Sequence, residues 1–219
     1  MEAILTVNNR DIIIALVLGD ITKIKTDVIV NAAHEALMGG GGVDGAIHRA
    51  AGQGLMSECR EIPKDKEGAR CRVGEAHITG GYNLLAKHVI HTVAPKFVGG
   101  IIRKKVDGQS IPLGLTLEDW SLTRDIYKNA KPGTDQDMEN CYRNCIELAD
   151  KYKLKSIVFP SLGTGGHAYP IQIACPIAIK TTLSTLAKTN FIEKVIFVCF
   201  SDIDFDVYKT TIEKIIKGI

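Results

Sequence analysis

The sequence feature best suited to chemistry is a run of glycines that ends in a carboxylate, Gly39-Gly40-Gly41-Gly42-Val43-Asp44-Gly45. Consecutive glycines leave backbone N–H groups unshielded and free to adopt positive φ, so such a loop can wrap closely round an oxyanion. The helix expected to follow adds its positive N-terminal end. This pattern predicts an anion cradle rather than a flexible linker. It is not a Walker loop, because no Gly-Lys-Ser or Gly-Lys-Thr follows.

A second glycine-rich turn, Ser161-Leu162-Gly163-Thr164-Gly165-Gly166, follows a stretch with the pattern of a buried strand. Ligands of open α/β sheets bind outside the carboxyl ends of strands, so two such loops would form a bipartite cradle suited to a diphosphate. A third expected strand end carries Gly19-Asp20-Ile21. Asp20 either accepts a hydrogen bond from an exocyclic amine, such as that of adenine, or caps the short turn 21–24.

Asp44 is the carboxylate inside the first glycine loop, and two roles are open for it. It either caps the following helix or, beside a diphosphate, orients or deprotonates a water molecule. Asn31 and His34 flank the loop and can hydrogen-bond the hydroxyls of a sugar. Structural roles are expected for the histidines within predicted strands and for the one on the short helix: His77, His88, His91 and His48.

These loops need a framework that brings them together, and the hydrophobic pattern predicts one. Short apolar runs rich in β-branched residues favour strands at 4–7, 12–18, 28–31, 76–79, 88–93, 156–159 and 195–200. Helical spacing predicts helices over 43–51, over 139–152 and at the C-terminus, and a further helix opened by Pro170 that Pro176 should kink or delay. We expect a three-layer α/β/α sandwich whose mixed central sheet has about six or seven strands.

Length and composition limit the function classes. The 219 residues are expected to form one domain, 1–219, with an insertion at about 96–137 that is partly ordered around 117–128. A net charge of +2 is too balanced for a protein whose main partner is bulk nucleic acid or an anionic membrane. An anionic ligand must therefore be held by local geometry.

The cysteine spacing and the N-terminal sequence predict where in the cell the protein lies. The six cysteines contain no CxxC pair and no metal-ligand spacing with histidine, so we expect no metal and a reducing compartment, cytoplasmic or nuclear. The N-terminus lacks the pattern of a signal peptide, and no apolar run approaches the length of a membrane span.

Further motifs carry a family resemblance: Asn31-Ala32-Ala33, the stretch 39–52, Ile78-Thr79-Gly80-Gly81-Tyr82 and His91-Thr92-Val93. Together with Gly19-Asp20-Ile21, they resemble a macrodomain of the MacroD type over nearly the whole chain except 96–137. The resemblance implies an α/β/α sandwich that binds ADP-ribose. It also implies hydrolysis of mono-ADP-ribosyl esters and deacetylation of O-acetyl-ADP-ribose, without metal or cofactor. The expected partners are ADP-ribose, O-acetyl-ADP-ribose and mono-ADP-ribosylated proteins, with nucleic acid only as an ADP-ribosylated end, and we expect a monomer.

The resemblance also implies roles for particular residues. Asp20 would receive the adenine amine, the glycine loops would hold the diphosphate through backbone amides, and Asn31 would hold the distal ribose. Phe200 would pack on adenine, although a Phe at a strand end is equally compatible with the core. The implied ligand-binding residues are Gly19, Asp20, Ile21, Asn31, Gly39, Gly40, Gly41, Gly42, Val43, Ser161, Gly163, Thr164, Gly165, Gly166, His167 and Phe200, and the implied catalytic residues are Asp44, His34 and Asn31.

Two positions depart from the family pattern. His34 stands where the family has a second asparagine, and His167, followed by Ala168, stands where an aromatic residue packs on the distal ribose. Both changes touch the distal-ribose end. We therefore expect an ADP-ribosyl-ester hydrolase with slow turnover, and the alternative is a non-catalytic reader of ADP-ribose.

Overall fold

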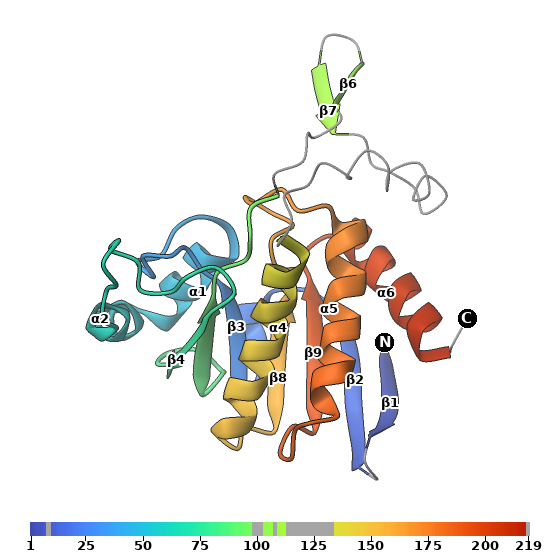
Figure 1. Cartoon of the computed structure of the whole chain (residues 1–219), viewed down its shortest axis with the longest axis horizontal. Coiled ribbons are helices and arrows are strands. Elements are labelled where there is room, and N and C mark those ends of the chain that lie inside the picture. The colour runs from blue at the N-terminus through green and yellow to red at the C-terminus, as the bar shows by residue number, and fades with distance from the viewer. Residues whose placement is uncertain (8–9, 98–102, 107–108, 113–133, 218–219) are drawn as a thin grey trace.

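The computed structural model describes residues 1–7, 10–97, 103–106, 109–112 and 134–217 (Figure 1). A mixed sheet runs in the order β1-β2-β9-β8-β3-β5-β4. Its strands are β1 (Glu2–Val7), β2 (Arg10–Leu18), β3 (Val28–Ala32), β4 (Ala76–Gly80), β5 (His88–Thr92), β8 (Ser156–Pro160) and β9 (Lys194–Cys199). Each lies where the β-branched apolar runs predicted a strand, so the expected mixed sheet is confirmed.

The two outermost strands, β1 and β4, are antiparallel to their neighbours, whereas the inner strands are all parallel. The chain opens with a β-hairpin, in which Glu2 of β1 pairs with Ala15 of β2. The five parallel strands β2, β9, β8, β3 and β5 therefore present their carboxyl ends along one edge of the sheet. That edge is where parallel sheets bind ligands.

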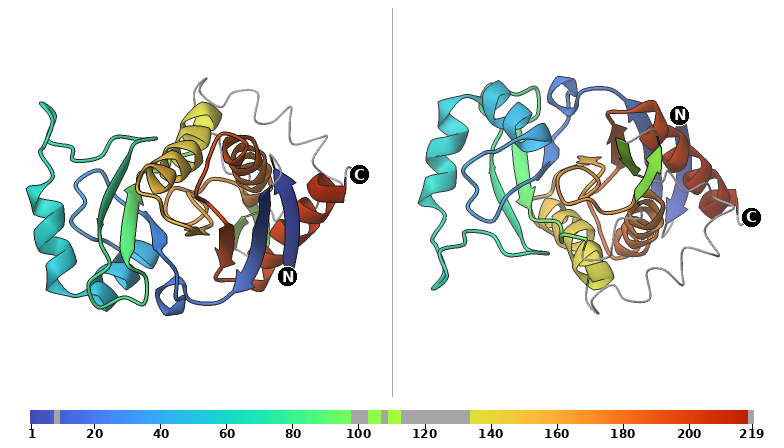
Figure 2. Two further views of the ribbon diagram at one scale, coloured as in Figure 1. Left: turned by 90° about the horizontal axis from the view of Figure 1, so that it is seen from below. Right: turned by 90° about the horizontal axis from the view of Figure 1, so that it is seen from above.

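Helices cover both faces of the sheet. The elements α1 (Gly42–Ala51) and α2 (Gln53–Glu61) pack on one face, and α4 (Thr134–Lys151), α5 (Ile171–Leu186) and α6 (Asp202–Lys217) pack on the other. In both views of Figure 2, α1 and α4 lie on opposite sides of the strands. None of the helices in the described ranges is long and apolar enough to span a bilayer.

Side-chain alternation along β3 decides which layer each residue faces. Val28 and Val30 belong to the apolar core under α4, α5 and α6, and Ile29 belongs to the core under α1 and α2. Because successive side chains point to opposite faces of a strand, Asn31 lies on the α1 side. This strand therefore delivers a fully buried polar side chain to the layer that carries the glycine loop.

Two features of the helices differ from expectation. The helix opened by Pro170 is not delayed by Pro176, because α5 begins at Ile171 and continues through the proline. Pro176 lies near the helix N-terminus, so the missing N–H removes a single bond, and burial of neighbours such as Ala178 and Ile179 offsets that loss. The second difference is α2, a helix that the sequence pattern did not predict.

The predicted insertion at about 96–137 is described only in part. Its expected ordered segment, 117–128, lies outside the described residues. Within the described ranges, β6 (Arg103–Val106) pairs antiparallel with β7 (Gln109–Pro112). The next helix, α4, begins at Thr134 rather than at Glu139.

Candidate functional site

The loops that carry the predicted site residues line up along the carboxyl edge of the parallel strands. Leu18 at the end of β2 pairs with Cys199 at the end of β9, and the Gly19 N–H donates to the Cys199 carbonyl at 2.9 Å. Ser161, just after β8, has its Oγ 3.9 Å from Cys199 Sγ. Because β8 also pairs with β3, the first glycine loop follows next along this edge.

Asp20 and Phe200 form one end of this row. Asp20 caps the 3-10 turn η1 (Ile21–Lys23), and its Oδ1 accepts from Thr22 N at 2.9 Å and from Thr22 Oγ1 at 2.8 Å. The cap role is therefore real, and Asp20 is exposed, with no described residue donating to its Oδ2. Phe200 is 89% exposed, so the alternative that it belongs to the core is wrong.

The first glycine loop ends at an uncapped helix N-terminus. Gly41 is the N-cap of α1 and has no side chain to bond the first backbone N–H groups. A Cβ placed at Gly41 or Gly42 would meet nothing within 4 Å, so there is open space beside both residues. At Gly45, by contrast, a Cβ would lie 2.3 Å from the Gly40 carbonyl oxygen. The loop is thus folded tightly onto α1 at Gly45 while Gly40, Gly41 and Gly42 are exposed, which is compatible with an anion cradle.

The second glycine loop is closed by its own backbone bonds. Gly163 has φ of 78°, and its carbonyl accepts from Tyr169 N–H at 3.0 Å. Gly165 and Gly166 are exposed, and a Cβ at either would meet nothing within 4 Å. His167 fastens the loop to the segment after β5, because its Nδ1 lies 2.7 Å from the carbonyl oxygen of Ala94. A carbonyl only accepts, so Nδ1 carries the proton and Nε2 is an acceptor when the ring is neutral.

Asp44 is buried at the start of α1, and it does not cap that helix. Its Oδ1 accepts from Asn31 Nδ2 at 2.7 Å, and His48 Nε2 lies 3.4 Å from the same oxygen. Burial raises the pKa of the Asp44 carboxyl above its ordinary value, and the Asn31 hydrogen bond and the nearby His48 and His34 partly offset that rise. The capping alternative for Asp44 is therefore wrong, and burial with a raised pKa is a property that Asp44 shares with general acid–base groups.

Asn31 lies behind Asp44 and is fully buried. Its Nδ2 bonds Asp44 and also lies 3.1 Å from His91 Nδ1, while its Oδ1 has no partner among the described residues. An unpaired buried acceptor costs about 1–3 kcal/mol. Asn31 contacts the Asp44 carboxylate from the buried, sheet side rather than from solvent. Its hydrogen bond therefore orients that carboxylate.

His48 and His91 are parts of this cluster to which the sequence pattern assigned only structural roles. His48 follows Asp44 by one helical turn, its side chain is only 8% exposed, and its ring centroid lies 6.2 Å from that of His91. The spacing of Asp44 and His48 on a helix was the available signal, because residues four apart lie on one face. The position of His91 depends on strand pairing and had no local signal.

His34, in contrast, is exposed at the mouth of the loop. Its Nδ1 accepts from Ala36 N–H at 3.3 Å, so the neutral ring carries its proton on Nε2. Its carbonyl accepts from Leu37 N–H at 2.8 Å in the turn that leads to the glycines. His34 is thus held by its turn, and it is one of the groups that act against the burial-induced rise in the Asp44 pKa.

Two clusters of described side chains carry donor atoms of the kinds that bind metals. Ligand atoms lie within 4.8 Å of one another in two groups of described residues: His48, Cys59 and His91, and Cys71, Glu75 and His77. Burial raises the pKa of Cys59 to about 11 and that of Cys71 to about 12, so both thiols are protonated at neutral pH. Metals bind the thiolate. In the first group, moreover, His91 Nε2 is already 2.9 Å from Thr79 Oγ1.

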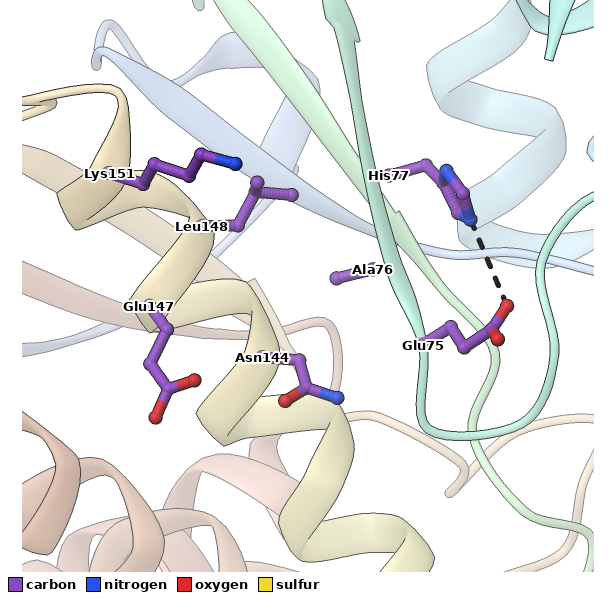
Figure 3. A pocket seen from close by; sticks show the side chains of 7 residues that line it. All are labelled: Glu75, Ala76, His77, Asn144, Glu147, Leu148 and Lys151. Atoms are coloured by element: carbon purple, nitrogen blue, oxygen red, sulfur yellow. Dashed lines mark ion pairs between the residues drawn. The ribbon is translucent and has the colours of Figure 1, made fainter.

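Two open cavities flank the edge strand β4, away from the glycine loops. One, of about 460 Å³, lies between β4 and α4, and Figure 3 shows its lining side chains with the 3.8 Å ion pair between Glu75 and His77. The other, of about 550 Å³, lies between β4 and α2. Neither is lined by a predicted site residue. The carboxyl edge of the parallel strands therefore remains the candidate site.

Comparison with known sequences agrees with the sequence motifs. A family model described as Macro domain matches residues 30–108 and 124–178. A macro domain-containing protein of Chlorobaculum tepidum is 42% identical over 199 residues, which cover 91% of this chain and 95% of that protein. The ADP-ribose glycohydrolase MACROD2 of Xenopus laevis is 38% identical over 192 residues, which cover 87% of this chain and 38% of that protein.

Solved structures show the same fold. An Oceanobacillus iheyensis macrodomain with ADP has a TM-score of 0.76 and 36% identity, with 100% of this chain and 98% of that chain covered. A Trypanosoma brucei macrodomain in complex with ADP-ribose has a TM-score of 0.69 and 32% identity, with 91% and 68% covered. With its α/β/α sandwich and its two glycine loops at the carboxyl edge of the sheet, this chain belongs to the Macro domain family.

Proposed function

We propose that this macrodomain binds ADP-ribose along the carboxyl edge and hydrolyses mono-ADP-ribosyl esters on proteins and O-acetyl-ADP-ribose. Adenine would lie between Asp20 and Phe200, and the diphosphate would lie between the two glycine loops. The distal ribose would then reach His34 and Asp44. The likeness to macrodomains solved with ADP and ADP-ribose supports this ligand, and the likeness to an ADP-ribose glycohydrolase supports this reaction.

The observation that carries the hydrolysis is the buried Asp44 carboxyl held by Asn31 at 2.7 Å. Its raised pKa makes it a better base than an exposed aspartate, and a neighbouring diphosphate would raise that pKa further by like-charge repulsion. Asp44 takes a proton from a water molecule whose oxygen attacks the acyl carbonyl or the anomeric carbon of the distal ribose. Attack on the acyl carbonyl breaks the acyl C–O bond, and attack on the anomeric carbon of a protein ester breaks the bond from that carbon to the ester oxygen. In either case Asp44 returns its proton to the leaving oxygen, and ADP-ribose and the carboxylic acid are released. This mechanism uses neither a metal nor a cofactor.

The second candidate function, a non-catalytic reader, is favoured by the two histidines at the distal-ribose end. His34 is held by Ala36 N–H and His167 by the Ala94 carbonyl, so neither ring is free to reorient around a reacting ribose. Small misplacements of reacting groups cost about a hundredfold in rate. We therefore expect hydrolysis by this protein to be slow.

Incubation with a mono-ADP-ribosylated protein distinguishes the two functions, because only the hydrolase releases free ADP-ribose. The matched control is Asp44→Ala, for which release should fall by about 10²–10⁴-fold. Binding of ADP-ribose without any release by the wild-type protein would identify a reader. Full activity in Asp44→Ala would refute the proposed mechanism.

The proposal extends to the setting of the protein. The six cysteines are all free and buried, which favours a reducing compartment, cytoplasmic or nuclear. We expect residues 1–219 to act as a single, monomeric macrodomain with an insertion at about 96–137. Its partners would be ADP-ribose, O-acetyl-ADP-ribose and mono-ADP-ribosylated proteins, with nucleic acid only as an ADP-ribosylated end.

A further inference from the structure

His91 lies in β5 directly beside Asn31 of β3, and both side chains are fully buried. We infer that His91 is a positioning residue: it holds the Asn31 amide in the orientation that aims the Asp44 carboxylate, without touching the substrate. The inference deepens the proposed function and rests on it for the rate effect. The hydrogen-bond geometry behind it stands independently of any reaction.

Strand register places these groups in one row. Asn31 pairs with His91 in the parallel register of β3 and β5, and His91 pairs with His77 in the antiparallel register of β5 and β4. The row lies on the α1 face of the sheet, where Asp44 enters from the helix. From Asp44, the Asn31 Nδ2 is 2.7 Å away, and the same nitrogen is 3.1 Å from His91 Nδ1.

The donors and acceptors along this row determine which atom donates in each hydrogen bond. An amide nitrogen only donates, so His91 Nδ1 must accept from Asn31 Nδ2. The neutral ring then carries its proton on Nε2, which donates to Thr79 Oγ1 at 2.9 Å. The Thr79 hydroxyl in turn donates to the Val89 carbonyl at 3.4 Å. The donation from Asn31 Nδ2 thus fixes the tautomer of His91, whose Nε2 faces Thr79 Oγ1 and, at 3.7 Å, Cys59 Sγ.

Burial keeps the His91 ring neutral. Full burial, together with the nearby His48 and His77, lowers the pKa of His91 to about 3. A protonated ring would place an N–H against the Asn31 amide and break the row. At any pH at which the protein is folded and active, His91 therefore remains an acceptor toward Asn31.

The Asn31 amide is anchored by these two contacts alone. Its Oδ1 is buried and has no partner in the described part of the chain, so that atom does not fix the side chain. Turning the amide over would set its oxygen against the Asp44 carboxylate and the His91 lone pair. Without the His91 acceptor, Asp44 is the remaining hydrogen-bond partner of Asn31 Nδ2. The Asn31 amide can then rotate, and the Asp44 carboxylate is no longer held in one orientation.

Three substitutions separate positioning from packing. His91→Leu removes both ring nitrogens, His91→Asn offers an amide oxygen near the position of Nδ1, and His91→Gln places its amide nitrogen near the position of Nε2. We expect kcat to fall by ~10–100-fold in His91→Leu, with little change in ADP-ribose affinity. His91→Asn should recover most of that loss, whereas His91→Gln should not.

Two spectroscopic readouts do not depend on turnover. ¹⁵N spectra of the imidazole should show a protonated Nε2 and an unprotonated Nδ1 in the wild-type protein. A carboxyl ¹³C titration should give a higher pKa for Asp44 in His91→Leu than in wild type, because the Asn31 bond that lowers this pKa is weakened. His91→Asn should return it toward the wild-type value.

The proposal is overturned if Nδ1 is the protonated nitrogen, or if the Asp44 pKa is the same in all these proteins. Equal loss of kcat in His91→Leu and His91→Asn also overturns it, since packing alone would then explain the effect. If wild type binds ADP-ribose without hydrolysing it, the proposed function fails while both spectroscopic tests still decide the role of His91. If His91→Leu does not fold, the comparison of His91→Asn with His91→Gln decides: equal kcat in these two variants overturns the proposal.

Discussion

Asp20→Asn is the substitution that most directly tests the adenine end of the site. Asp20 Oδ1 accepts both bonds from Thr22, at 2.9 Å and 2.8 Å, and Oδ2 has no described partner. In the asparagine variant the amide oxygen must keep the Thr22 bonds, because only it can accept them. The amide nitrogen then stands where Oδ2 stood. A hydrogen-bond acceptor facing the base is thereby replaced by a donor, while the cap is retained.

The two roles of Asp20 contribute differently to the free energies of ligand binding and of unfolding. A hydrogen bond to a charged group contributes about 1.5–3 kcal/mol, and exposure of Asp20 favours the lower end, so Asp20→Ala should weaken ADP-ribose binding roughly 10-fold. Loss of a cap costs about 0.5–2 kcal/mol, and for a short 3-10 turn the lower half applies. At about 2–4 °C per kcal/mol, Asp20→Ala should lower Tm by roughly 1–4 °C. Asp20→Asn should leave Tm nearly unchanged.

The assay is calorimetric titration of wild type, Asp20→Ala and Asp20→Asn with ADP-ribose and with its hypoxanthine analogue, alongside thermal unfolding. The hypoxanthine ring carries a carbonyl where adenine carries its amine. Wild type should prefer adenine, Asp20→Ala should lose that preference, and Asp20→Asn should reverse it. If Asp20→Asn binds both ligands as wild type does, Asp20 does not face the base. A lower Tm for Asp20→Ala with unchanged affinity would leave capping as its only role.

Three further predictions concern the phosphate and ribose ends. Gly41→Glu and Gly165→Glu should abolish ADP-ribose binding in calorimetric titration, whereas alanine at either position should not, because a Cβ there meets nothing within 4 Å. His34→Asn should accelerate single-turnover hydrolysis, since asparagine still accepts from the following turn and restores the family's residue; a slower variant would contradict this. Asp44→Asn should abolish turnover and raise Tm at neutral pH. The raised pKa of Asp44 means that stability is lost as pH rises through that pKa, so the Tm difference from wild type should grow from pH 4 to pH 8.

The strands were predictable because their signal is local. Runs such as Ser156–Pro160 combine β-branched and aromatic residues with buried positions on both faces, as a central parallel strand requires. The start of α1 and its end at Gly52 were also predictable from the local sequence. Gly52 adopts a positive φ of 82° at the break before α2, a conformation that favours glycine. The two glycine loops follow from the same kind of information.

The missed elements depend on contacts between distant segments. α2 contains Gly54, which argues against a helix in isolation, yet a Cβ there would lie 2.3 Å from the ring of Tyr82. The ring of Tyr82 packs where any side chain at position 54 would lie, which explains why glycine stands in this helix despite its low helix propensity. His91 is 60 residues from its partner Asn31, so only the pairing of β5 with β3 brings the two together.

Electrostatics favour the hydrolase over the reader. A reader needs the glycine amides and the α1 N-terminus, all of which attract a diphosphate. Asp44 does the opposite, because a buried carboxylate beside the loop would repel a diphosphate. The fold also leaves Asn31 Oδ1 unpaired while its amide nitrogen holds that carboxylate. Both costs weaken binding or stability, and both are accounted for if Asp44 accepts a proton from water.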